Sequence, residues 1–310
     1  MSGHIVAVGS INMDLVIRTP HHPQLGETVM GGSFQTFPGG KGANESVAAA
    51  RLGATVKLIG CVGTDGFGDA LLQTVRADKI DTTYIRQHAT MPTGVAFILV
   101  DDTTGQNNIV LAEGANGSVT AKTVSESEKA FEGASVLTLN LECTLEAIER
   151  AVELAQKYSV RVVFNPAPYQ PLPRKLLADV DYLILNQIEI ISLLGRPIPV
   201  EDHKALSAAV KKMQADKLLR NVIVTLGEDG SLAIPLNEEA THLPAYAVKA
   251  VDTVAAGDAF VGAFAVAISE GYSTLEAARW GNAAGALAVT KSGAQPSLPT
   301  RAEFNRFLQR

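Results

Sequence analysis

The chain has 310 residues, of which 46% are hydrophobic and 19% are charged, and its formal net charge is −6. This composition is typical of a globular protein, and the acidic balance gives no sign of a basic surface for nucleic acid. The longest apolar run, Ala259 to Ile268, is too short to span a membrane, and the apolar start, His4 to Gly9, is too short for a signal peptide. Cys61 and Cys143 have no CxxC spacing, which indicates two reduced thiols and a cytoplasmic protein.

Short apolar runs alternate with helical patterns along the chain, which is typical of a parallel sheet with helices on its faces. Helices are predicted over Gly42–Leu52, with Gly53 closing it, and over Thr144–Tyr158, with Thr144 as the N-cap. The pattern predicts six core strands: Ile5–Gly9, Val56–Gly60, Val136–Leu139, Val162–Phe164, Tyr182–Leu185 and Val222–Thr225.

Two segments interrupt this alternation. Leu15 to Phe37 has strand character without a helix, and Gly94 to Glu113 has the pattern of a hairpin with the polar turn "DDTTGQNN". Together they predict a small antiparallel sheet attached to the large domain. A lid over an active site and a plain extension of the sheet edge are both open.

The stretch "PGGKGANES", Pro38–Ser46, is the first candidate for chemistry. Its glycines run into a helix start, where free N–H groups would face a polar or anionic ligand. It is neither a Walker A loop, because Gln35 and Gly42 stand at required positions, nor a GxGxxG motif, because Glu45 occupies the sixth position. A sharp loop that feeds a helix is the alternative.

Polar residues also follow several predicted strands, where open α/β sheets bind ligands. In "GSINMDL", Asn12 and Asp14 suit a polyhydroxylated ligand, although an Asx turn would use the same residues. "NPAP" at Asn165–Pro168 and "NQIE" at Asn186–Glu189 offer oxygens to Mg²⁺ through water, or cap helix starts. "TLGEDGS", Thr225–Ser231, is either a phosphate-binding turn or a tight turn between strands.

In "VDTVAAGDAF", a run of small residues precedes an apolar helix. Ala255, Ala256 and Gly257 would leave backbone N–H groups free to stabilise charge on a transferring phosphoryl group. Asp258 at the same point could take a proton from a hydroxyl, or could simply cap the helix.

The motifs "GSINMD", "GGKGAN", "NPAP", "NQIE", "TLGEDG", "VDTVAAGDAF" and "VTKSGAQPS" resemble, in order and spacing, those of the ribokinase (phosphofructokinase-B) family of sugar kinases. The resemblance covers about Gly9 to Ser297. It implies an α/β fold with a Rossmann-like, mostly parallel central sheet flanked by helices. It also implies one kinase domain over 1–310, with a small β-sheet lid from about 14–38 and 93–114.

The resemblance also implies roles for individual residues. Asp258 would be the catalytic base, beside an anion hole of Ala255, Ala256 and Gly257. Sugar contacts would come from Asn12, Asp14, Gly39, Gly40, Lys41, Gly42, Asn44, Glu142 and Asp258. ATP contacts would come from Asn186, Thr225, Leu226, Gly227, Glu228, Asp229, Gly230, Gly257 and Asn282. Glu189, with Asn186, would organise Mg²⁺, and a K⁺ loop would comprise Asp252, Val254, Ala288, Lys291, Gly293 and Ser297.

The implied reaction is ATP-dependent phosphorylation of the 5-hydroxyl of D-ribose, in a homodimer formed through the lid. Four positions depart from the family pattern: Glu45, Cys143, Thr144 and Gln187. One alternative is a kinase for 2-deoxyribose, another pentose or a nucleoside, with Val95, Phe97 and Ile109 as candidates for the wall of its site. The pair Asn12 and Asp14 favours ribose. Another alternative is a regulator that binds sugar or nucleotide without catalysis.

Overall fold

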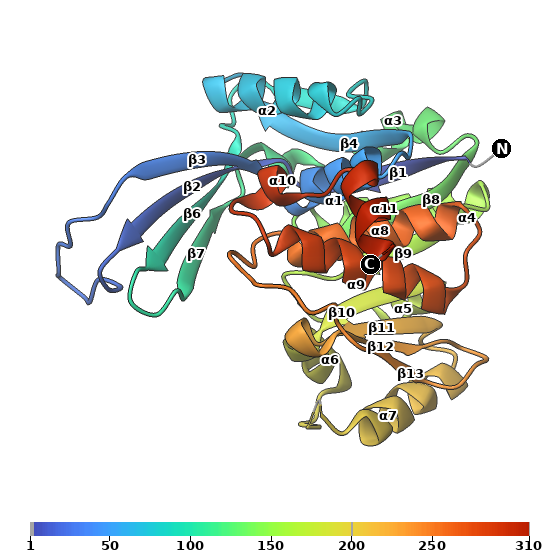
Figure 1. Cartoon of the computed structure of the whole chain (residues 1–310). Helices are drawn as coiled ribbons and strands as arrows, with labels where there is room; N and C mark the ends of the chain where they lie inside the picture. Colours follow the sequence, from blue (N-terminus) through green and yellow to red (C-terminus); the bar gives the residue numbers. More distant parts are fainter. Residues whose placement is uncertain (1–2, 200, 310) are drawn as a thin grey trace.

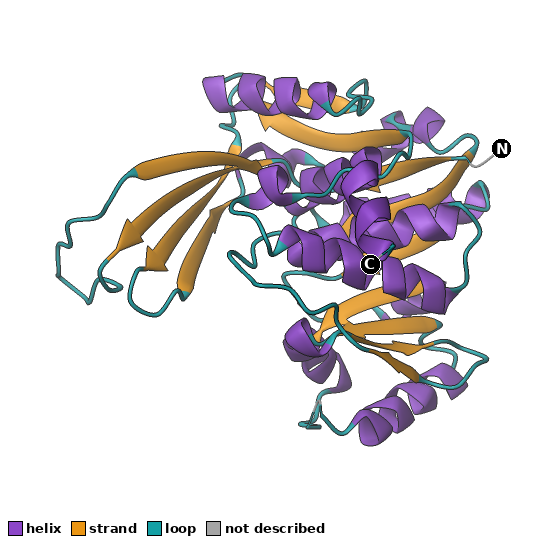
Figure 2. Ribbon diagram, in the orientation of Figure 1, coloured by secondary structure: helices purple, strands orange, loops and turns teal. Residues whose placement is uncertain are grey.

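The computed structural model describes residues 3–199 and 201–309 of the chain. Within them, one sheet has nine strands in the order β13-β12-β11-β10-β9-β8-β1-β4-β5 (Figures 1 and 2). The seven strands β11, β10, β9, β8, β1, β4 and β5 run parallel to one another. Strands β12 and β13 form an antiparallel edge beside β11. All six predicted strands are confirmed. The strands are β1 (His4–Val8), β4 (Val56–Gly63), β5 (Ile85–His88), β8 (Ala134–Asn140), β9 (Arg161–Asn165), β10 (Tyr182–Asn186), β11 (Asn221–Thr225), β12 (Ser231–Ile234) and β13 (Thr241–Leu243).

Helices cover both faces of this sheet, so its central strands are buried on both sides. In β1, Ile5 and Ala7 pack into one hydrophobic cluster, and Val6 and Val8 pack into the other. The first cluster takes side chains from α1 (Lys41–Arg51), α2 (Gly66–Ala77), α8 (Ala256–Ser269), α9 (Thr274–Ala288) and α11 (Arg301–Leu308). The second takes them from α3 (Ala121–Glu126), α4 (Leu145–Lys157), α5 (Arg174–Asp179), α6 (Gln187–Leu194) and α7 (His203–Ala215).

The predicted helix boundaries hold to within one residue. Helix α1 begins at Lys41, one residue before the predicted start, and Gly53 follows its end with a φ of 96°. Thr144 is the N-cap of α4, where its side chain accepts the N–H of Ala147. No helix in the described ranges is long and apolar enough to cross a bilayer.

Helices α1 and α8 approach closely because α8 carries a glycine at their contact. A Cβ at Gly262 would lie 2.6 Å from the Cβ of Ala48 and 2.7 Å from the carbonyl oxygen of Glu45. Any larger residue would therefore push the two helices apart. The close contact matters for the site because the N-terminal turns of both helices supply side chains to it.

A second sheet projects from the edge of the large one, at the left of Figure 1. It comprises β2 (Asn12–Thr19), β3 (Phe34–Gly39), β6 (Gly94–Asp101) and β7 (Asn107–Ala112) in the order β3-β2-β6-β7. The predicted hairpin is confirmed as β6 and β7, but the sheet is not wholly antiparallel, because β2 and β6 pair in parallel. Both strands leave the large domain from the same edge, after the parallel strands β1 and β5, so they run in the same direction.

Candidate active site

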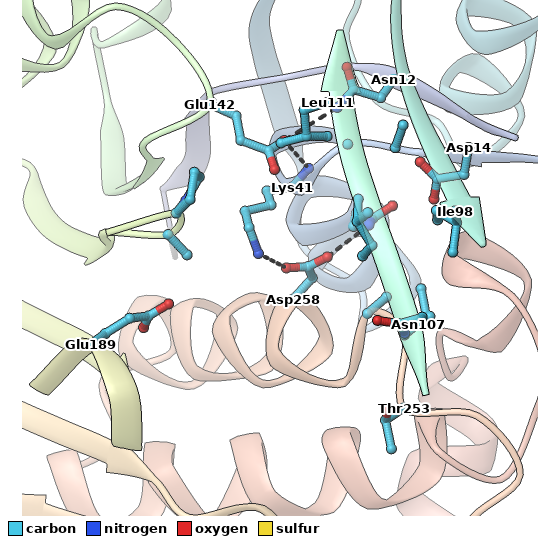
Figure 3. Close-up of a pocket in the computed structure, with 18 residues that line it drawn as sticks. Asn12, Asp14, Lys41, Ile98, Asn107, Leu111, Glu142, Glu189, Thr253 and Asp258 are labelled. Carbon is cyan, nitrogen blue, oxygen red and sulfur yellow. Dashed lines mark hydrogen bonds and ion pairs between the residues drawn. The ribbon is translucent and has the colours of Figure 1, made fainter. Parts of the chain in front are cut away.

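A cavity of about 490 Å³ lies between the small sheet and the ends of β1, β8 and β9 (Figure 3). Polar side chains reach it from β2, from the start of α1, from the segment after β8 and from the first turn of α8. The cavity therefore collects residues from distant parts of the chain. It lies at the carboxyl ends of parallel strands, as expected for an open α/β sheet.

The glycine-rich segment before α1 folds tightly against the start of β2. Gly40 is the N-cap of α1 with a φ of 87°, and a Cβ there would lie 2.6 Å from the backbone nitrogen of Asn12. Gly40 and Lys41 line the cavity, whereas Gly39 and Gly42 lie behind its wall, packed against Asp14 and Gly9. Part of the predicted supply of free N–H groups is also used internally, because the N–H of Ala43 donates to the carbonyl of Ser10 at 3.0 Å.

Asp258 is buried in the first turn of α8 with its carboxylate aimed into the cavity (Figure 3). It is not the N-cap of the helix, which is Ala255. Its Oδ2 accepts a hydrogen bond of 2.7 Å from Nδ2 of Asn44, and its Oδ1 lies 3.6 Å from Nζ of Lys41. The Asp258 charge is the main reason why the pKa of Lys41 is raised, so this ammonium stays protonated beside the carboxylate.

The loop before α8 presents backbone N–H groups to the same side. Ala255 has a φ of 60°, a left-handed conformation that costs a non-glycine residue on the order of 1 kcal/mol. The N–H groups of Gly257 and Asp258 find no backbone acceptor in the preceding loop, as expected for the first turn of a helix. This end of α8 is therefore suited to an anionic ligand.

A fixed polar wall opposite Asp258 is built around Glu142. Its Oε2 accepts hydrogen bonds from Oγ of Ser10 at 2.5 Å and from Nδ2 of Asn12 at 3.3 Å. The other end of the Asn12 amide accepts Nδ2 of Asn116 at 2.6 Å, so the orientation of this amide is set. Sequence reasoning missed Ser10 and Asn116. The only signal for Asn116 was its place in the small-residue stretch "GANGS" after the hairpin.

Asp14 lies on the same wall but makes no hydrogen bond with its side chain in the described part of the chain. Burial raises the pKa of its carboxyl to about 7, and the nearby Glu142 and Asp258 carboxylates add to the effect. Burial also raises the pKa of Glu142, which the Lys41 ammonium opposes. The cavity thus crowds acidic groups around one lysine.

The predicted Asn186–Glu189 pair is a capping box at the start of α6. Oδ1 of Asn186 accepts the N–H groups of Ile188 and Glu189, both at 2.9 Å, and Oε2 of Glu189 accepts the N–H of Asn186 at 2.8 Å. Glu189 nevertheless also lines the cavity. Burial raises the pKa of this carboxyl. The structural and ligand-binding interpretations of this motif are therefore compatible.

The other residues predicted to bind nucleotide do not line the cavity. Thr225 to Gly230 forms a turn after β11 that includes the 3₁₀ helix η3 (Gly227–Asp229), and the imidazole Nε2–H of His242 donates to the carbonyl of Asp229 at 2.7 Å. Asn282, on α9, donates its Nδ2 to the carbonyl of Leu243 at 3.1 Å, so its amide already holds the end of β13.

The predicted cation loop is brought together by Asp252. Its Oδ1 accepts the N–H of Val254 at 3.0 Å and its Oδ2 accepts the N–H of Gly293 at 2.9 Å, which joins the segment before α8 to the segment after α9. Near Gly293, Ser297 lies in α10 (Ala294–Ser297) and donates its Oγ to Ala294. Ala288 accepts the N–H of Lys291, whose ammonium lies 2.8 Å from Glu303.

A family model described as "pfkB family carbohydrate kinase" matches residues 2–301. The chain belongs to this family. It is 40% identical over 305 residues to a ribokinase of Haemophilus influenzae, with 98% of each chain covered. It is 34% identical to a deoxyribokinase of Salmonella typhi, again with 98% of each covered. The structure of Arabidopsis thaliana ribokinase complexed with ribose and ATP matches all of this chain and all of that one, with a TM-score of 0.91 and 31% identity.

In this pfkB-family kinase, the small sheet forms the apolar wall of the cavity. Ala96 and Ile98 from β6, and Ile109 and Leu111 from β7, line it together with the polar Asn107. Of the three candidates for this wall, only Ile109 lines it, because Val95 and Phe97 alternate with Ala96 and Ile98 and so point to the other face. That outer face is apolar and exposed, with Phe34 59%, Phe97 52% and Val110 66% exposed.

Proposed function

We propose that the chain is an ATP-dependent sugar kinase that phosphorylates the 5-hydroxyl of D-ribose and releases D-ribose 5-phosphate and ADP. One observation carries this proposal: a buried aspartate, Asp258, points into a polar cavity at the open N-terminus of α8. The close similarity to proteins named ribokinase, over nearly the whole chain, supports ribose as the substrate.

In the proposed reaction, Asp258 accepts the proton of the 5-hydroxyl while the hydroxyl oxygen forms a bond to the γ-phosphorus. The bond from that phosphorus to the β–γ bridging oxygen of ATP breaks, and ADP leaves with the electron pair. The Lys41 ammonium, 3.6 Å from Asp258, and the free N–H groups of α8 lie where they can stabilise the charge on the phosphoryl group. Asn44 keeps the Asp258 carboxylate oriented toward the substrate.

Sugar recognition would rest on the wall opposite Asp258. A ribose presents several hydroxyl groups, each of which can donate and accept a hydrogen bond. Asp14 and Glu142 supply acceptors, and the amide of Asn12 is fixed between Glu142 and Asn116. Gly40 and Lys41 close this wall, with Gly39 and Gly42 behind them.

The nucleotide would lie across Asn186, the Thr225–Gly230 turn, Gly257 and Asn282. Mg²⁺, when bound, would neutralise charge on the ATP phosphates. The capping box leaves Oε1 of Glu189 without a cap partner, so this residue fits an indirect role through water. Membership of the pfkB family supports the assignment of ATP and Mg²⁺ to this chain.

K⁺ would be held by mostly backbone oxygens of the loop around Asp252, Val254, Ala288, Lys291, Gly293 and Ser297. The loop fits a hard monovalent cation. Its one carboxylate already accepts two N–H groups, and its other possible cation ligands are carbonyl and hydroxyl oxygens. Since Asp252 also holds Val254, the cation would shape the anion hole without touching the substrate.

We also infer that the small sheet serves as a lid and that two chains associate through its apolar outer face. A cytoplasmic location, a single kinase domain and a homodimer remain predictions. An exposed patch that contains Phe34, Phe97 and Val110 would favour such an association. The mass in solution, measured by light scattering for the wild type and for Val110→Asp, tests it: a wild-type monomer would contradict the dimer.

A second candidate is phosphorylation of 2-deoxyribose, favoured by the similarity to the Salmonella typhi deoxyribokinase. The polar wall around Asn12 argues for ribose, because a buried polar group that loses its hydroxyl partner disfavours the deoxy sugar. The cavity, at about 490 Å³, is within the usual range of ligand pockets, so its size does not by itself exclude a nucleoside.

The decisive experiment measures ADP release with D-ribose, 2-deoxyribose, other pentoses and nucleosides, with Mg²⁺ and with or without K⁺. Ribose-dependent turnover that rises with K⁺ is expected. Asp258→Asn should abolish turnover and leave ribose binding by calorimetry largely intact. Binding of ribose without turnover by the wild type would favour a non-catalytic regulator, and unchanged turnover in the variant would exclude Asp258 as the base.

A further inference from the structure

Glu45 is a buried carboxyl that the proposed reaction does not use. It lies on α1 directly after Asn44, only 1% of it is exposed, and neither carboxyl oxygen has a hydrogen-bond partner in the described part of the chain. An ionised carboxylate buried without a partner is strongly unfavourable, and such groups normally keep their proton instead. The surroundings of Glu45 decide which form is present.

The charged groups that face Glu45 come from three packed elements. Lys41 lies on the same helix, Asp258 lies on α8, and Glu142 follows β8. Two of these three are acidic, and the one ammonium is already engaged with Asp258 at 3.6 Å. Burial, followed by the Asp258 charge, raises the pKa of Glu45 well above its usual range, and Lys41 opposes this only in part. A further negative charge here would also repel the phosphates of ATP.

Asn140, the last residue of β8, shows what a neutral Glu45 could do. This side chain is fully buried, and its Oδ1 accepts the N–H of Glu142 at 3.2 Å. Since a donor occupies Oδ1, the amide is oriented and its Nδ2 needs an acceptor, yet Nδ2 has no hydrogen-bond partner among the described residues. The Glu45 carboxyl, whose oxygens also lack a partner, lies close enough to Asn140 for the Asn140 amide to lower the Glu45 pKa.

We propose that Glu45 is a positioning residue held as a neutral carboxylic acid, whose carbonyl oxygen accepts the amide of Asn140 and so keeps Glu142 in place on the cavity wall. The structure shows the later links, from Asn140 to the backbone of Glu142 and from the Glu142 carboxylate to Ser10 and Asn12, and the proposed hydrogen bond adds Glu45 to them. The proposed protonation state of Glu45 depends only on the folded structure, whereas its proposed effect on sugar binding rests on the proposed function.

The protonation state is tested by equilibrium unfolding in urea between pH 5 and pH 8, with wild type and Glu45→Gln. In the unfolded chain Glu45 loses its proton above about pH 4.5, but the folded protein must keep it, so wild-type stability is lost as pH rises. The amide of the variant has the same shape and no proton to lose. The unfolding constant of the variant, relative to wild type, should fall by up to tenfold per pH unit.

A matched control is Glu149→Gln, an exposed glutamate on α4. Its stability difference from wild type should stay constant over this pH range. If the stability difference between Glu45→Gln and wild type is also constant with pH, or if the variant loses stability relative to wild type as pH rises, Glu45 is ionised in the folded protein and the proposal is wrong. This measurement uses no substrate, so it is independent of the proposed reaction.

The positioning role is tested by kinetics at pH 7. Glu45→Gln should keep kcat/KM for ribose within about twofold of wild type, because the amide oxygen accepts the same hydrogen bond. Glu45→Leu, which cannot accept one, should lower kcat/KM for ribose about tenfold while KM for ATP stays close to wild type. Full activity of Glu45→Leu, or a loss of ribose turnover in folded Glu45→Gln, would overturn the positioning role. If Glu45→Leu does not fold, the Glu45→Gln kinetics decide.

Discussion

Replacement of Asp14 by asparagine should make the protein more stable and a poorer enzyme, and both effects should depend on pH. The Asp14 carboxyl is only 7% exposed and has a pKa raised to about 7, from 3.8 in an unperturbed side chain, by burial and then by the charges of Glu142 and Asp258. In the unfolded chain the same carboxyl loses its proton near pH 4. The stability that depends on this carboxyl is therefore fully present below that pH and is lost as pH rises from about 4 to about 7.

The size of the effect follows from the two pKa values. Each pH unit between them corresponds to 1.36 kcal/mol, so the full change is on the order of 4 kcal/mol by pH 8. The asparagine side chain of the variant has no proton to lose and escapes this change. Urea unfolding should show equal stability of wild type and Asp14→Asn at pH 4 and a more stable variant at pH 8. This sacrifice of stability for binding is common at active sites.

Ribose kinetics should move in the opposite direction. At pH 8 the ionised Asp14 accepts sugar hydroxyls through hydrogen bonds to a charged group, worth about 1.5–3 kcal/mol, so the variant should lose roughly tenfold to a hundredfold in kcat/KM for ribose. At pH 6 most of the wild type carries the proton, and the gap should narrow. A variant that is equally impaired at pH 6 and pH 8, or no more stable than wild type at pH 8, would refute this account of Asp14.

Three further changes test other contacts of the site. Asn44→Ala removes the donor to Asp258 and should lower kcat about tenfold to a hundredfold with little effect on KM for ATP. A rise in KM for ATP with an unchanged kcat would contradict this. His242→Phe keeps an aromatic ring on β13 but loses the hydrogen bond to the carbonyl of Asp229, so KM for ATP should rise about threefold to tenfold while KM for ribose is unchanged. Arg51→Met removes the ion pair with Asp78 and two hydrogen bonds that tie α1 to the carbonyls of Gln295 on α10 and of Leu298 after it. It should lower the free energy of unfolding by about 2 kcal/mol and raise the K⁺ concentration for half activation; an unchanged urea midpoint would contradict this.

Much of the fold could be predicted because local patterns decide it. The six predicted strands of the large sheet are apolar runs that pack into both hydrophobic clusters, and α1 and α4 carry their cap residues at the expected positions. The parallel pairing of β2 with β6 could not be predicted, because it depends on where two segments about 80 residues apart leave the large domain. A hairpin pattern alone says nothing about such a partner.

A second feature that the sequence could not predict is which face of a strand lines the cavity. The alternation in "GVAFILV" shows that Val95 and Phe97 share one face and Ala96 and Ile98 the other, but both faces contain apolar residues. In this sheet one face lines the cavity and the other is exposed on the outside. Only the position of the sheet over the cavity settles which is which, and that position comes from the connections to β1 and η1 (Gly114–Ser118).

Contacts between residues far apart in the sequence are a third feature that the sequence could not predict, and these contacts decide the chemistry of the site. The bond from Asn44 to Asp258 joins residues 214 positions apart, and the bond from Asn116 to Asn12 joins residues 104 apart. Each motif alone allowed a capping residue or a functional one. For Glu189 the two roles coincide, because one carboxyl oxygen caps α6 and the same side chain lines the cavity.

Asp258 shows the opposite outcome, and the reason lies in the backbone. A side-chain cap at the start of α8 would occupy the N–H groups that an anionic ligand needs. Ala255 takes the N-cap position instead, without a side-chain hydrogen bond and at the cost of a left-handed conformation. With this N-cap, the N–H groups of Gly257 and Asp258 find no acceptor in the preceding loop, and the Asp258 carboxylate lies beside Asn44 and Lys41. The same local arrangement therefore provides both the base and the anion-binding end of the helix.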